Sequence, residues 1–478
     1  MLERCYQLSN LLIREKFKFI ALYGDNSCDW VIVDLACQQA SICLIPIPTF
    51  FSQKQIAHVF NTVAIDLIIC DSTEDFIAVS GLSLNAASAI QYGQMQLMTF
   101  GIRQTGLLLP EGTHKITFTS GSTGQPKGVC LSSEQQLTQA GALATVVAMQ
   151  QPKHLCLLPL STLLENIAGI YVPLIAGGQV IIPPLAELGF EGSSTLNPQL
   201  FCAAISRYQP SSIILTPQLL VLLIATVSQG WTPPSSLKFV AVGGGRVSAE
   251  LMAQAHQCNI PVYEGYGLSE CTSVVSLNTP SNNGANTSGK SLPHLQVEIE
   301  NGEIVIKGNA MLGYAGQPDS WYQEKIYSGD LGSLDSAGYL TVTGRRKNLL
   351  ISSFGRNINP EWVESQLLSN IAIADAVVFG DDRPYCVALL YPRDPSLTDD
   401  AIQTFIDGVN HSLPDYARIV RWMRLPAGLN TQPGLLANNG RPVRPAIMAA
   451  HPLLLDALYN NSTQHLTATD NSKQVLLT

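Results

Sequence analysis

Short β-rich apolar runs alternate with helical patterns through most of this chain, and no other feature limits the fold as strongly. Near the N-terminus "FIALYG" is followed by a helical pattern in "CDWVIVDLACQQAS", and then by "CLIPIPT", "KQIAHVFNTV" and "IDLIICD". Further along, "HLCLLPL", "SSIILT" and "LKFVAVGG" are each followed by a helical run. Strands that alternate with helices form largely parallel sheets with helices on their faces. The sequence therefore predicts an α/β fold.

The pattern changes at about Val297. The segments "VEIENGEIVIKG" and "GYLTVTGRRKN" alternate with turn residues, which is typical of antiparallel hairpins, and "AVVFGDD" and "YCVALLYP" follow as strands of a smaller unit. A chain of 478 residues is also too long for one compact core. We predict a large domain over residues 1–345, with α/β sheets and a small antiparallel β-barrel-like part, and a smaller α+β domain over 346–452. The polar residues 453–478 are predicted to be a disordered tail.

Composition excludes some classes of function. The chain has 27 basic and 36 acidic residues and a net charge of −9, so we expect no nucleic-acid partner, which would need a clustered basic face. Eleven cysteines occur without a C-x-x-C pair or a Cys/His zinc spacing, so residues such as Cys37, Cys43 and Cys202 are predicted to be buried thiols in a reducing compartment. Charged residues interrupt every apolar run near the N-terminus, whereas a signal peptide needs an uninterrupted apolar region. We therefore expect a cytoplasmic location.

The most membrane-like stretch is "SSIILTPQLLVLLIATVSQ". It is barely long enough to span a bilayer, and Pro217 and Gln218 interrupt it. We predict a buried strand and a buried helix that are separated at "TPQ", and no transmembrane segment. Peripheral contact with a membrane is compatible with this prediction.

The stretch "GANTSGKS", Gly284 to Ser291, satisfies the P-loop pattern G-x-x-x-x-G-K-[ST]. A phosphate-binding loop of that kind leaves a strand and opens a helix, whose N-terminus helps to hold the phosphates. Here turn residues precede the motif, and a proline and a β pattern follow it. The context therefore predicts a surface loop that leads into a hairpin. The alternative, a Walker-type NTPase, would release phosphate and depend on Lys290.

A second loop, in "ITFTSGSTGQPKGV", is the stronger candidate for a phosphate site. A β run ends at Thr119, glycines allow close approach of the backbone, hydroxyl groups add donors, and Lys127 supplies a cation. A helix is predicted to begin just after it, because Ser132 and Gln135 have the spacing of a capping box. The loop residues are Ser120, Gly121, Ser122, Thr123 and Gly124.

The "TSGSTGQPKGV" loop resembles the phosphate loop of the AMP-forming adenylating enzymes, which include acyl-CoA synthetases, luciferase and peptide-synthetase adenylation domains. Companion motifs follow in order: "AVGGGRVS" resembles the adenine-side loop, "YEGYGLSE" the G-Y-G-x-[ST]-E element, "SGDLG" the ribose-binding motif, and "GRRKNLLISSFGRNINPEWVE" the hinge and the stretch after it. "LPLSTLLENIAGIYVPLIAGG" resembles the segment that lines the acyl pocket in the fatty-acid branch. The resemblance covers nearly the whole chain, and in it the GANTSGKS motif falls between functional elements.

The resemblance implies that a carboxylate attacks the α-phosphate of ATP to give an acyl-adenylate, and that CoA then takes the acyl group. Lys127 and the loop from Thr119 to Gly124 would hold the β- and γ-phosphates, and Glu270 would bind Mg²⁺, which favours hard oxygen ligands. Ser269 stands where most relatives have threonine. Asp330 would accept the ribose hydroxyls, and Arg345 would bind ribose or phosphate. The adenine slot would consist of Gly243, Gly244, Gly245, Gly265, Tyr266 and Gly267, with the Tyr266 ring stacked on the base.

The resemblance also implies that the small domain rotates about Lys347 and that Gly355 borders the CoA channel. Asn359 is predicted to cap a helix, with Pro360 at its first position and Glu361 and Glu364 in its first turn. Two departures stand out. Arg441 occupies the position of the lysine that bridges the carboxylate and the α-phosphate, and arginine does not replace lysine conservatively. Thr162 stands where many fatty-acid enzymes have histidine.

The aliphatic segments around "PLSTLLENIAGIYVPL" and "TPQLLVLLI" favour a fatty acid over an amino acid. The leading hypothesis is therefore a long-chain fatty acid–CoA ligase that uses ATP, Mg²⁺ and CoA, with Lys127, Glu270 and Arg441 as catalytic residues. One alternative forms the same acyl-adenylate but passes it to an acyl carrier protein or closes a β-lactone. Another, suggested by Arg441, is a non-catalytic relative that binds an adenylate or a lipid. The sequence does not determine the oligomeric state.

Overall fold

The computed structural model of the chain describes residues 1–82, 89–99, 107–119, 126–191, 195–354, 356–437 and 440–459. It contains two compact units, Met1–Val342 and Thr343–Thr478. The limit between them falls within β21 (Leu340–Arg345), at the end of which we predict the domain boundary. Each unit is described by itself, beginning with the larger one.

The first sheet of the large unit has eight strands in the order β19-β7-β6-β2-β1-β3-β5-β4. Its central strands pair in parallel, as predicted, whereas the strands at both edges pair antiparallel. Helices α1 (Leu2–Arg14), α2 (Cys28–Ala40), α3 (Gln53–Thr62) and α4 (Thr73–Ser80) belong to the same part of the chain. The strands are β1 (Phe19–Tyr23), β2 (Cys43–Pro46), β3 (Leu67–Cys70), β4 (Ala89–Tyr92), β5 (Met95–Thr99), β6 (Lys115–Thr119), β7 (Lys127–Leu131) and β19 (Gly313–Tyr314).

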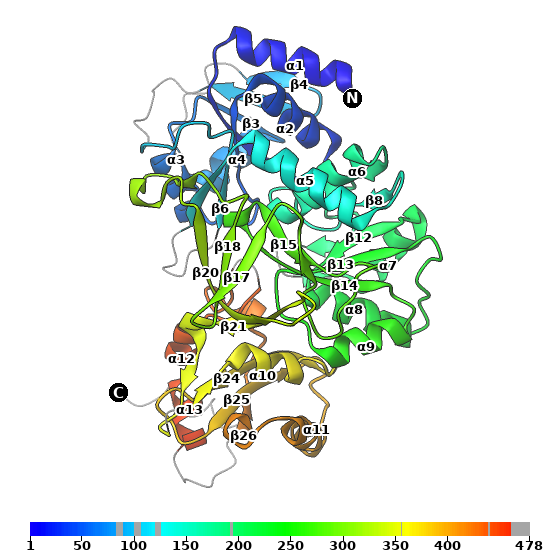
Figure 1. Cartoon of the computed structure of the whole chain (residues 1–478), viewed down its shortest axis with the longest axis vertical. Coiled ribbons are helices and arrows are strands. Elements are labelled where there is room, and N and C mark those ends of the chain that lie inside the picture. Colours follow the sequence, from blue (N-terminus) through cyan, green and yellow to red (C-terminus); the bar gives the residue numbers. More distant parts are fainter. Residues whose placement is uncertain are drawn as a thin grey trace. The chain divides into compact units, whose positions relative to one another are not determined.

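The second sheet has seven strands in the order β16-β15-β14-β13-β12-β8-β9, and the five from β14 to β9 pair in parallel. Figure 1 shows β12, β13 and β14 side by side, with α8 and α9 next to them. Its strands are β8 (Lys153–Leu155), β9 (Gln179–Ile181), β12 (Ser212–Leu215), β13 (Phe239–Val242), β14 (Val262–Leu268), β15 (Ser273–Leu277) and β16 (Lys290–Ser291). The helices of this region are α5 (Ser133–Val147), the π-helix η1 (Glu165–Tyr171), α6 (Val172–Ile175), α7 (Pro198–Tyr208), α8 (Pro217–Ser228), α9 (Ala249–Gln257) and the 3₁₀ turn η2 (Ser269–Cys271). A small hairpin, β10 (Phe190–Glu191) and β11 (Thr195–Leu196), lies before α7.

Local sequence signals fix several helix boundaries. Ser132 and Gln135 form the predicted capping box at the start of α5. Thr216 caps α8, so the strand β12 and the helix α8 are separated at "TPQ" as predicted. Among the described residues, no helix has both the length and the apolar character needed to cross a membrane.

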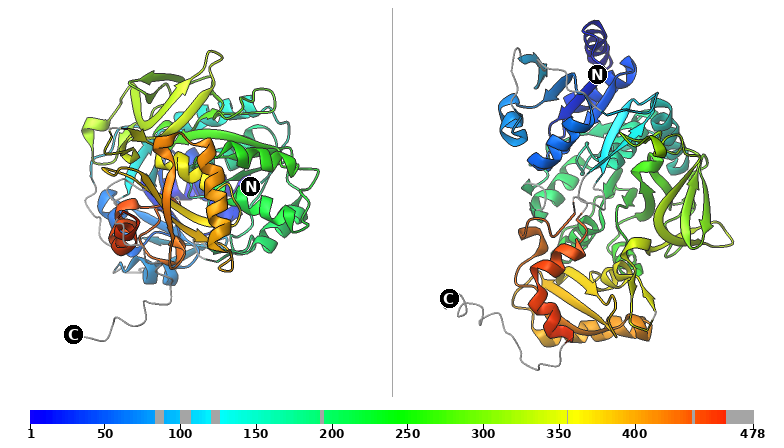
Figure 2. Two further views of the ribbon diagram at one scale, coloured as in Figure 1. Left: turned by 90° about the horizontal axis from the view of Figure 1, so that it is seen from below. Right: turned by 90° about the vertical axis from the view of Figure 1, so that its left-hand side faces the viewer.

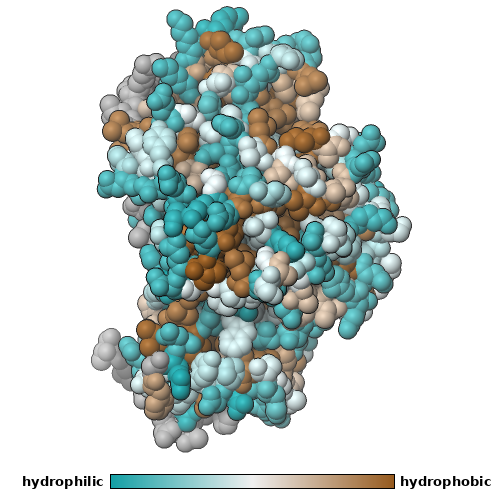
Figure 3. Space-filling model, in the orientation of Figure 1, coloured by the Kyte–Doolittle hydropathy of each residue, from teal (hydrophilic) through white to brown (hydrophobic). Residues whose placement is uncertain are grey.

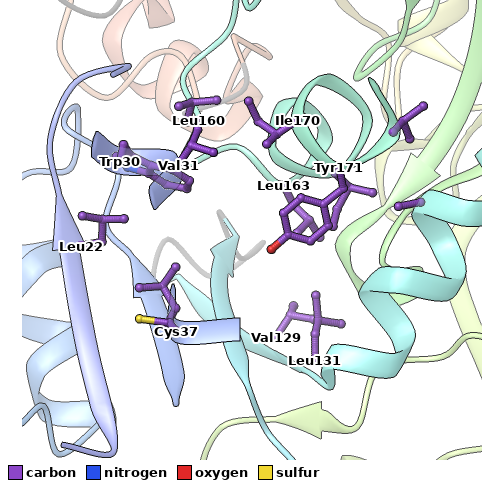
Figure 4. Close-up of a cluster of buried hydrophobic side chains, with 14 of the residues drawn as sticks. Leu22, Trp30, Val31, Cys37, Val129, Leu131, Leu160, Leu163, Ile170 and Tyr171 are labelled. Carbon is purple, nitrogen blue, oxygen red and sulfur yellow. The ribbon is translucent and has the colours of Figure 1, made fainter. Parts of the chain in front are cut away.

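One hydrophobic core includes residues of both sheets. Figure 4 shows Trp30, Val31 and Cys37 of α2 in this cluster together with Leu163 and Tyr171 from the η1 region. A buried polar network lies within it, because Lys115 Nζ is 2.8 Å from Asp34 Oδ1 and 2.6 Å from Asn166 Oδ1. Tyr171 and Asn166 also donate hydrogen bonds to Asp34 Oδ2. Breaking a buried ion pair such as Lys115–Asp34 is strongly destabilising. Through Asn166 the network also connects η1 to the first sheet.

A four-stranded sheet in the order β17-β18-β20-β21 follows in the large unit. The pairing of β17 with β18 is the predicted antiparallel hairpin, and β18 also pairs antiparallel with β20. The strands are β17 (Gln296–Glu300), β18 (Glu303–Lys307), β20 (Lys325–Leu334) and β21. The 3₁₀ turn η3 (Pro318–Ser320) precedes β20.

The small unit is built on the three-stranded sheet β24-β25-β26. Alternate residues of these strands belong to two separate cores, one with α10 and α11 and the other with α12 and α13. Figure 2 shows α11 in orange and α12 and α13 in red on opposite sides of this sheet. The elements are η4 (Arg346–Asn348), β22 (Leu350–Ile351), β23 (Asn357–Ile358), α10 (Pro360–Leu367), β24 (Ile373–Phe379), β25 (Cys386–Pro392), α11 (Asp399–Ser412), η5 (Asp415–Ala417), β26 (Ile419–Arg424), η6 (Leu429–Thr431), α12 (Arg444–Ala450) and α13 (Pro452–Tyr459).

Two predictions for the small unit need correction. Residues 453–459, predicted to begin a disordered tail, form α13, because Leu455 and Leu458 are buried in the core of this unit. Asn359 caps α10 with Pro360 at its start, as predicted, but Glu364 lies beyond the first turn. It is buried and pairs with Arg444.

The polarity of the surface and the burial of the cysteines are as the composition predicts. In Figure 3 hydrophilic and hydrophobic residues are interspersed over the visible face. All eleven cysteines are free, and only Cys28 is exposed and Cys258 half-buried. Cys37, Cys43 and Cys202 are buried thiols, as predicted.

Candidate active site

The predicted phosphate loop connects the two strands of a hairpin. Thr119 ends β6 and Lys127 begins β7, and the two residues are cross-strand partners. The residues between them that we predict to bind phosphate, Ser120, Gly121, Ser122, Thr123 and Gly124, lie outside the described part of the chain. The hairpin therefore fixes the two ends of the loop and the position of Lys127.

Tyr314 links Lys127 to Glu270. The strand β19 pairs antiparallel with β7, so that Tyr314 lies opposite Val129. The ring centroid of Tyr314 is 4.7 Å from Lys127 Nζ, which is a cation–π distance. The hydroxyl of Tyr314 donates a 2.7 Å hydrogen bond to Glu270 Oε1. A cation and a carboxylate that are distant in the sequence thus contact the same side chain.

The backbone around Glu270 is held firmly. Ser269 and Glu270 lie in η2, and the carbonyl oxygen of Glu270 accepts a 2.7 Å hydrogen bond from the amide of Met311. The chain then turns into β15 through Thr272 and Ser273, which have positive φ values of 57° and 99°. Glu270 forms no ion pair within the described part of the chain, so its carboxylate fits the role of a ligand for a hard cation.

Tyr266 and Asp330 meet at the other side of the predicted nucleotide site. The Tyr266 hydroxyl, on β14, donates a 2.7 Å hydrogen bond to Asp330 Oδ2, on β20. Asp330 is only 6% exposed. Burial, together with the negative charge of Asp330, raises the pKa of Tyr266 well above its usual value. The phenol therefore remains a neutral donor, and its hydrogen bond fixes the orientation of the ring.

The glycine-rich loop after β13 lies beside the EGYG segment. Strands β13 and β14 are parallel and Val242 pairs with Glu264, so Gly243 and Gly265 follow at the same end of the sheet. A Cβ atom on Gly243 would lie 3.3 Å from the carbonyl oxygen of Gly265. Gly244 has a φ of +79°, Gly245 lies beside the Pro217 ring, and a side chain on Gly267 would overlap the backbone of Ser273. These glycines allow two backbone segments to approach closely.

Glu264 is the first residue of the EGYG segment and is half-buried. Its Oε1 accepts a 3.2 Å hydrogen bond from Ser288 of the GANTSGKS loop. Desolvation raises the pKa of Glu264 to about 7, although Ser288 and Arg246 act in the opposite direction.

The GANTSGKS motif has the structure that its context predicts. It runs through a loop into the short strand β16, and β17 comes next, so no helix begins after it. Its backbone groups are occupied within the fold, since the amide of Gly284 donates to Asn278 Oδ1 and the amide of Ser288 donates to the carbonyl of Leu340. These amides are used within the fold, and the loop lacks the helix N-terminus of a phosphate cradle.

The remaining predicted site residues belong to the small unit. Arg345 ends β21, Lys347 is exposed in η4, and the carbonyl oxygen of Arg441 accepts a hydrogen bond from the amide of Ala437. Gly355 lies outside the described part of the chain. The roles of these residues stay predictions.

An apolar cavity lies in the large unit, beside the strand β13 that leads to the glycine loop. Phe239 and Ala241 of β13 line it, and the next residues of the chain are Val242 and Gly243. Its other walls come from α5, η1, α6 and β15, and His154 and Ser212 are its polar residues. The predicted acyl-pocket segment therefore does border a cavity, through Leu164, Ala168 and Val172.

Sequence reasoning missed Tyr314. Its only local signal is an aromatic residue between glycines in "LGYAG", and the pairing of β19 with β7 is needed to place it at the site.

Comparison with known proteins agrees with this geometry. Residues 1–315 match the family model "AMP-binding enzyme", and residues 347–463 match "AMP-binding enzyme C-terminal domain". The 2-succinylbenzoate–CoA ligase of Bacillus subtilis (strain 168) is 27% identical over 348 residues, which are 69% of this chain and 63% of the relative. The corresponding protein of Bacillus velezensis is 30% identical over 292 residues, 57% of each chain. The matches thus span less than two thirds of either relative.

Solved structures show the same fold. An anthranilate CoA ligase in complex with anthranoyl-AMP superposes with a TM-score of 0.77 at 16% identity, over 94% of this chain and 90% of the other. O-succinylbenzoate coenzyme A synthetase from Bacillus subtilis, in complex with ATP and a magnesium ion, gives a TM-score of 0.70 at 21% identity, over 93% and 92%. The family model covers most of the large unit, and the chain belongs to the AMP-binding enzyme family.

Proposed function

We propose that the protein is an adenylate-forming acid–CoA ligase. In the first step a carboxylate oxygen of the acid attacks the α-phosphorus of ATP, the bond to the bridging oxygen breaks, and pyrophosphate leaves. In the second step the thiol of CoA attacks the acyl carbon of the adenylate, loses its proton, and displaces AMP. The linkage of Lys127 to Glu270 through Tyr314 is the observation that carries this proposal.

The first step must bring two anions together, so positioned cations lower its barrier. Lys127 stands at the end of the phosphate loop, and its ammonium group would bind the pyrophosphate portion of ATP. Glu270 would hold Mg²⁺, which neutralises charge on the phosphates when it is bound. Lys127 and Glu270 both contact Tyr314, the lysine through the face of the ring and the carboxylate through the hydroxyl.

The other half of the site would hold adenosine. Only Gly244 of this group faces open space at its Cβ position, where a flat base would find room, and the fixed ring of Tyr266 offers a stacking face. Asp330, which holds that ring through one carboxylate oxygen, would accept the ribose hydroxyls.

For the acid we propose a substrate whose carboxylate is attached to a hydrophobic body. Among the described residues that line the cavity there is no lysine or arginine, and only His154 and Ser212 are polar, so the lining holds no permanently charged partner for a second carboxylate. This feature favours a fatty acid, including a long-chain one, over the dicarboxylate that gives the relatives their name. An aromatic monocarboxylate also satisfies the chemistry of the lining.

The test is a measurement of pyrophosphate release with Mg-ATP and a panel of acids: fatty acids of increasing length, benzoate, and 2-succinylbenzoate. We expect release with the apolar acids, and an acyl thioester once CoA is added. If the acyl group is transferred to a carrier protein and not to CoA, the carrier protein is the acceptor and the CoA step of the proposal is wrong. If no acid gives pyrophosphate or acyl-AMP, with wild type or with Arg441→Lys, the enzymatic proposal is wrong and a binding function takes its place.

A further inference from the structure

A cluster of three buried side chains lies outside the nucleotide site, and one of them, His154, lines the apolar cavity. His154 belongs to β8, Cys156 follows two residues later, and Glu165 begins η1. His154 is 2% exposed, and Cys156 and Glu165 are fully buried. One potential ligand atom from each residue lies within 4.8 Å of the other two. Nitrogen, sulfur and oxygen donors of this kind are the ligands that Zn²⁺ takes in proteins.

The histidine is oriented as a metal ligand. Its Nδ1 is 3.0 Å from the hydroxyl of Ser212, the cross-strand partner of His154 on β12. Its Nε2 points to Glu165, 3.2 Å from Oε1. In metalloproteins the second ring nitrogen of a ligating histidine is held in this way by a hydrogen-bonding group.

The carboxylate carries an unused acceptor. Glu165 Oε2 is buried and has no hydrogen-bonding partner within the described structure. A buried carboxylate oxygen without a partner is costly, and a bound cation removes that cost. Gly169 makes the close packing here feasible, because a Cβ at this position would lie 2.7 Å from Glu165 Oε1 and 2.9 Å from His154 Nε2.

Charge balance points the same way. A divalent cation bound to one carboxylate, one thiolate and one neutral imidazole gives a neutral cluster, as a dry site requires. Binding releases the proton of the Cys156 thiol to solvent, so no oxidant or reductant is needed.

We propose that His154, Cys156 and Glu165 bind one Zn²⁺ ion, which fastens η1 to β8 at the wall of the cavity. The spacing of the set, H-x-C-x₈-E, differs from the usual sequence patterns of zinc ligands. The third ligand lies on a π-helix, an element rare in proteins and frequent at functional sites. The site uses none of the nucleotide-site residues, so zinc binding can be measured separately from adenylation, although His154 also lines the cavity proposed for the acid.

The experiment measures zinc content and cobalt spectra of the full chain without ATP or Mg²⁺. Protein treated with a chelator is reconstituted with ZnCl₂ or CoCl₂, passed through a desalting column, and analysed by inductively coupled plasma mass spectrometry. The Cys28→Ser background removes the exposed thiol, which could bind metal unspecifically. We expect one zinc per chain, a near-ultraviolet thiolate-to-cobalt charge-transfer band, and a higher Tm with zinc.

Cys156→Ser is expected to lower zinc affinity about 100-fold or more and to remove the cobalt band, since changes to second-shell residues alone cost about 10- to 100-fold. Cys202→Ser is the matched control, a buried thiol elsewhere in the large unit, and should bind zinc as the background does. If Cys156→Ser does not fold, as circular dichroism will reveal, Glu165→Gln serves instead, because its amide keeps the shape of the carboxylate. A background protein without bound zinc, or a folded Cys156→Ser or Glu165→Gln variant that retains it at full affinity, contradicts the proposal.

Discussion

Two glycine-rich loops of the large unit each end in a lysine whose ammonium group lies 4.7 Å from the centroid of a tyrosine ring. Lys127 is paired with Tyr314, and Lys290 with Tyr339. Each lysine also begins a β-strand. The two loops differ in what surrounds this pair. The Tyr314 hydroxyl continues to the Glu270 carboxylate, whereas the loop before Lys290 uses its own backbone groups in internal hydrogen bonds.

The comparison teaches that a sequence motif and a local contact do not define a phosphate site. The match to the P-loop pattern belongs to the loop that is internally bonded. The loop at Lys127 lacks that pattern but lies beside a carboxylate suited to a cation.

Lys127→Ala is expected to lower acid-dependent pyrophosphate release by about 10²- to 10³-fold, because one preorganised cation is lost where charge develops. Lys290→Ala, the matched control, should remain close to wild type. Steady-state rates at saturating Mg-ATP measure both. Equal losses in the two variants would remove the distinction between the loops.

Glu270→Gln is expected to lower the same rate by about 10²-fold and to raise the Mg²⁺ concentration that half-saturates the enzyme. The amide keeps the acceptor oxygen for Tyr314 but removes the charge that a cation needs. A magnesium titration at fixed ATP checks the prediction. An unchanged magnesium requirement would show that Glu270 only positions Tyr314.

Tyr314→Phe is expected to lower the rate by about 10-fold, in line with the loss of one hydrogen bond to a charged group. The ring, and with it the cation–π contact to Lys127, is kept. Tyr339→Phe makes the same chemical change beside Lys290 and should have no effect on the rate.

The loop before Lys290 has a structural role, because its Ser288 donates a hydrogen bond to the carboxyl group of Glu264. Glu264→Gln tests this role. Burial raises the pKa of Glu264 from 4.5 to about 7, so the folded state holds its proton more tightly than the unfolded state does. The protonated carboxyl group of Glu264 stabilises the folded state fully below pH 4.5, and this stabilisation is lost as the pH rises to about 7. Between about pH 5 and about pH 8 the wild type should lose on the order of 1–3 kcal/mol more unfolding free energy than Glu264→Gln.

Urea denaturation at several pH values measures that difference. Parallel pH profiles for the wild type and Glu264→Gln would mean that the carboxyl group is ionised in the folded protein at neutral pH.

Features set by neighbouring residues could be predicted from the sequence. The capping box of Ser132 and Gln135, the Asn359 cap and the break at Thr216 each depend on a few adjacent side chains, and all three are present. The order of strands and helices follows from hydrophobic periodicity. Lys127, Glu270 and Tyr266 could be named because the motifs that contain them are long.

Features that depend on pairing between distant segments could not be predicted. Tyr314 reaches the site only because β19 pairs with β7, and α13 is helical because its leucines find a core on β25 and its neighbours. The buried network of Asp34, Lys115 and Asn166 likewise joins three separate segments. Hydrophobic periodicity indicates which face of a helix or strand is buried, but not which distant residues pack against it.

Adenylation at the Lys127 loop can be measured as the exchange of labelled pyrophosphate into ATP, with and without an apolar acid. Reversible adenylation at the Lys127 loop predicts exchange that requires the acid, disappears in Lys127→Ala and persists in Lys290→Ala. Adenylation at the Lys127 loop is contradicted if the protein releases phosphate without the acid and without exchange, and if Lys290→Ala abolishes this release while Lys127→Ala does not.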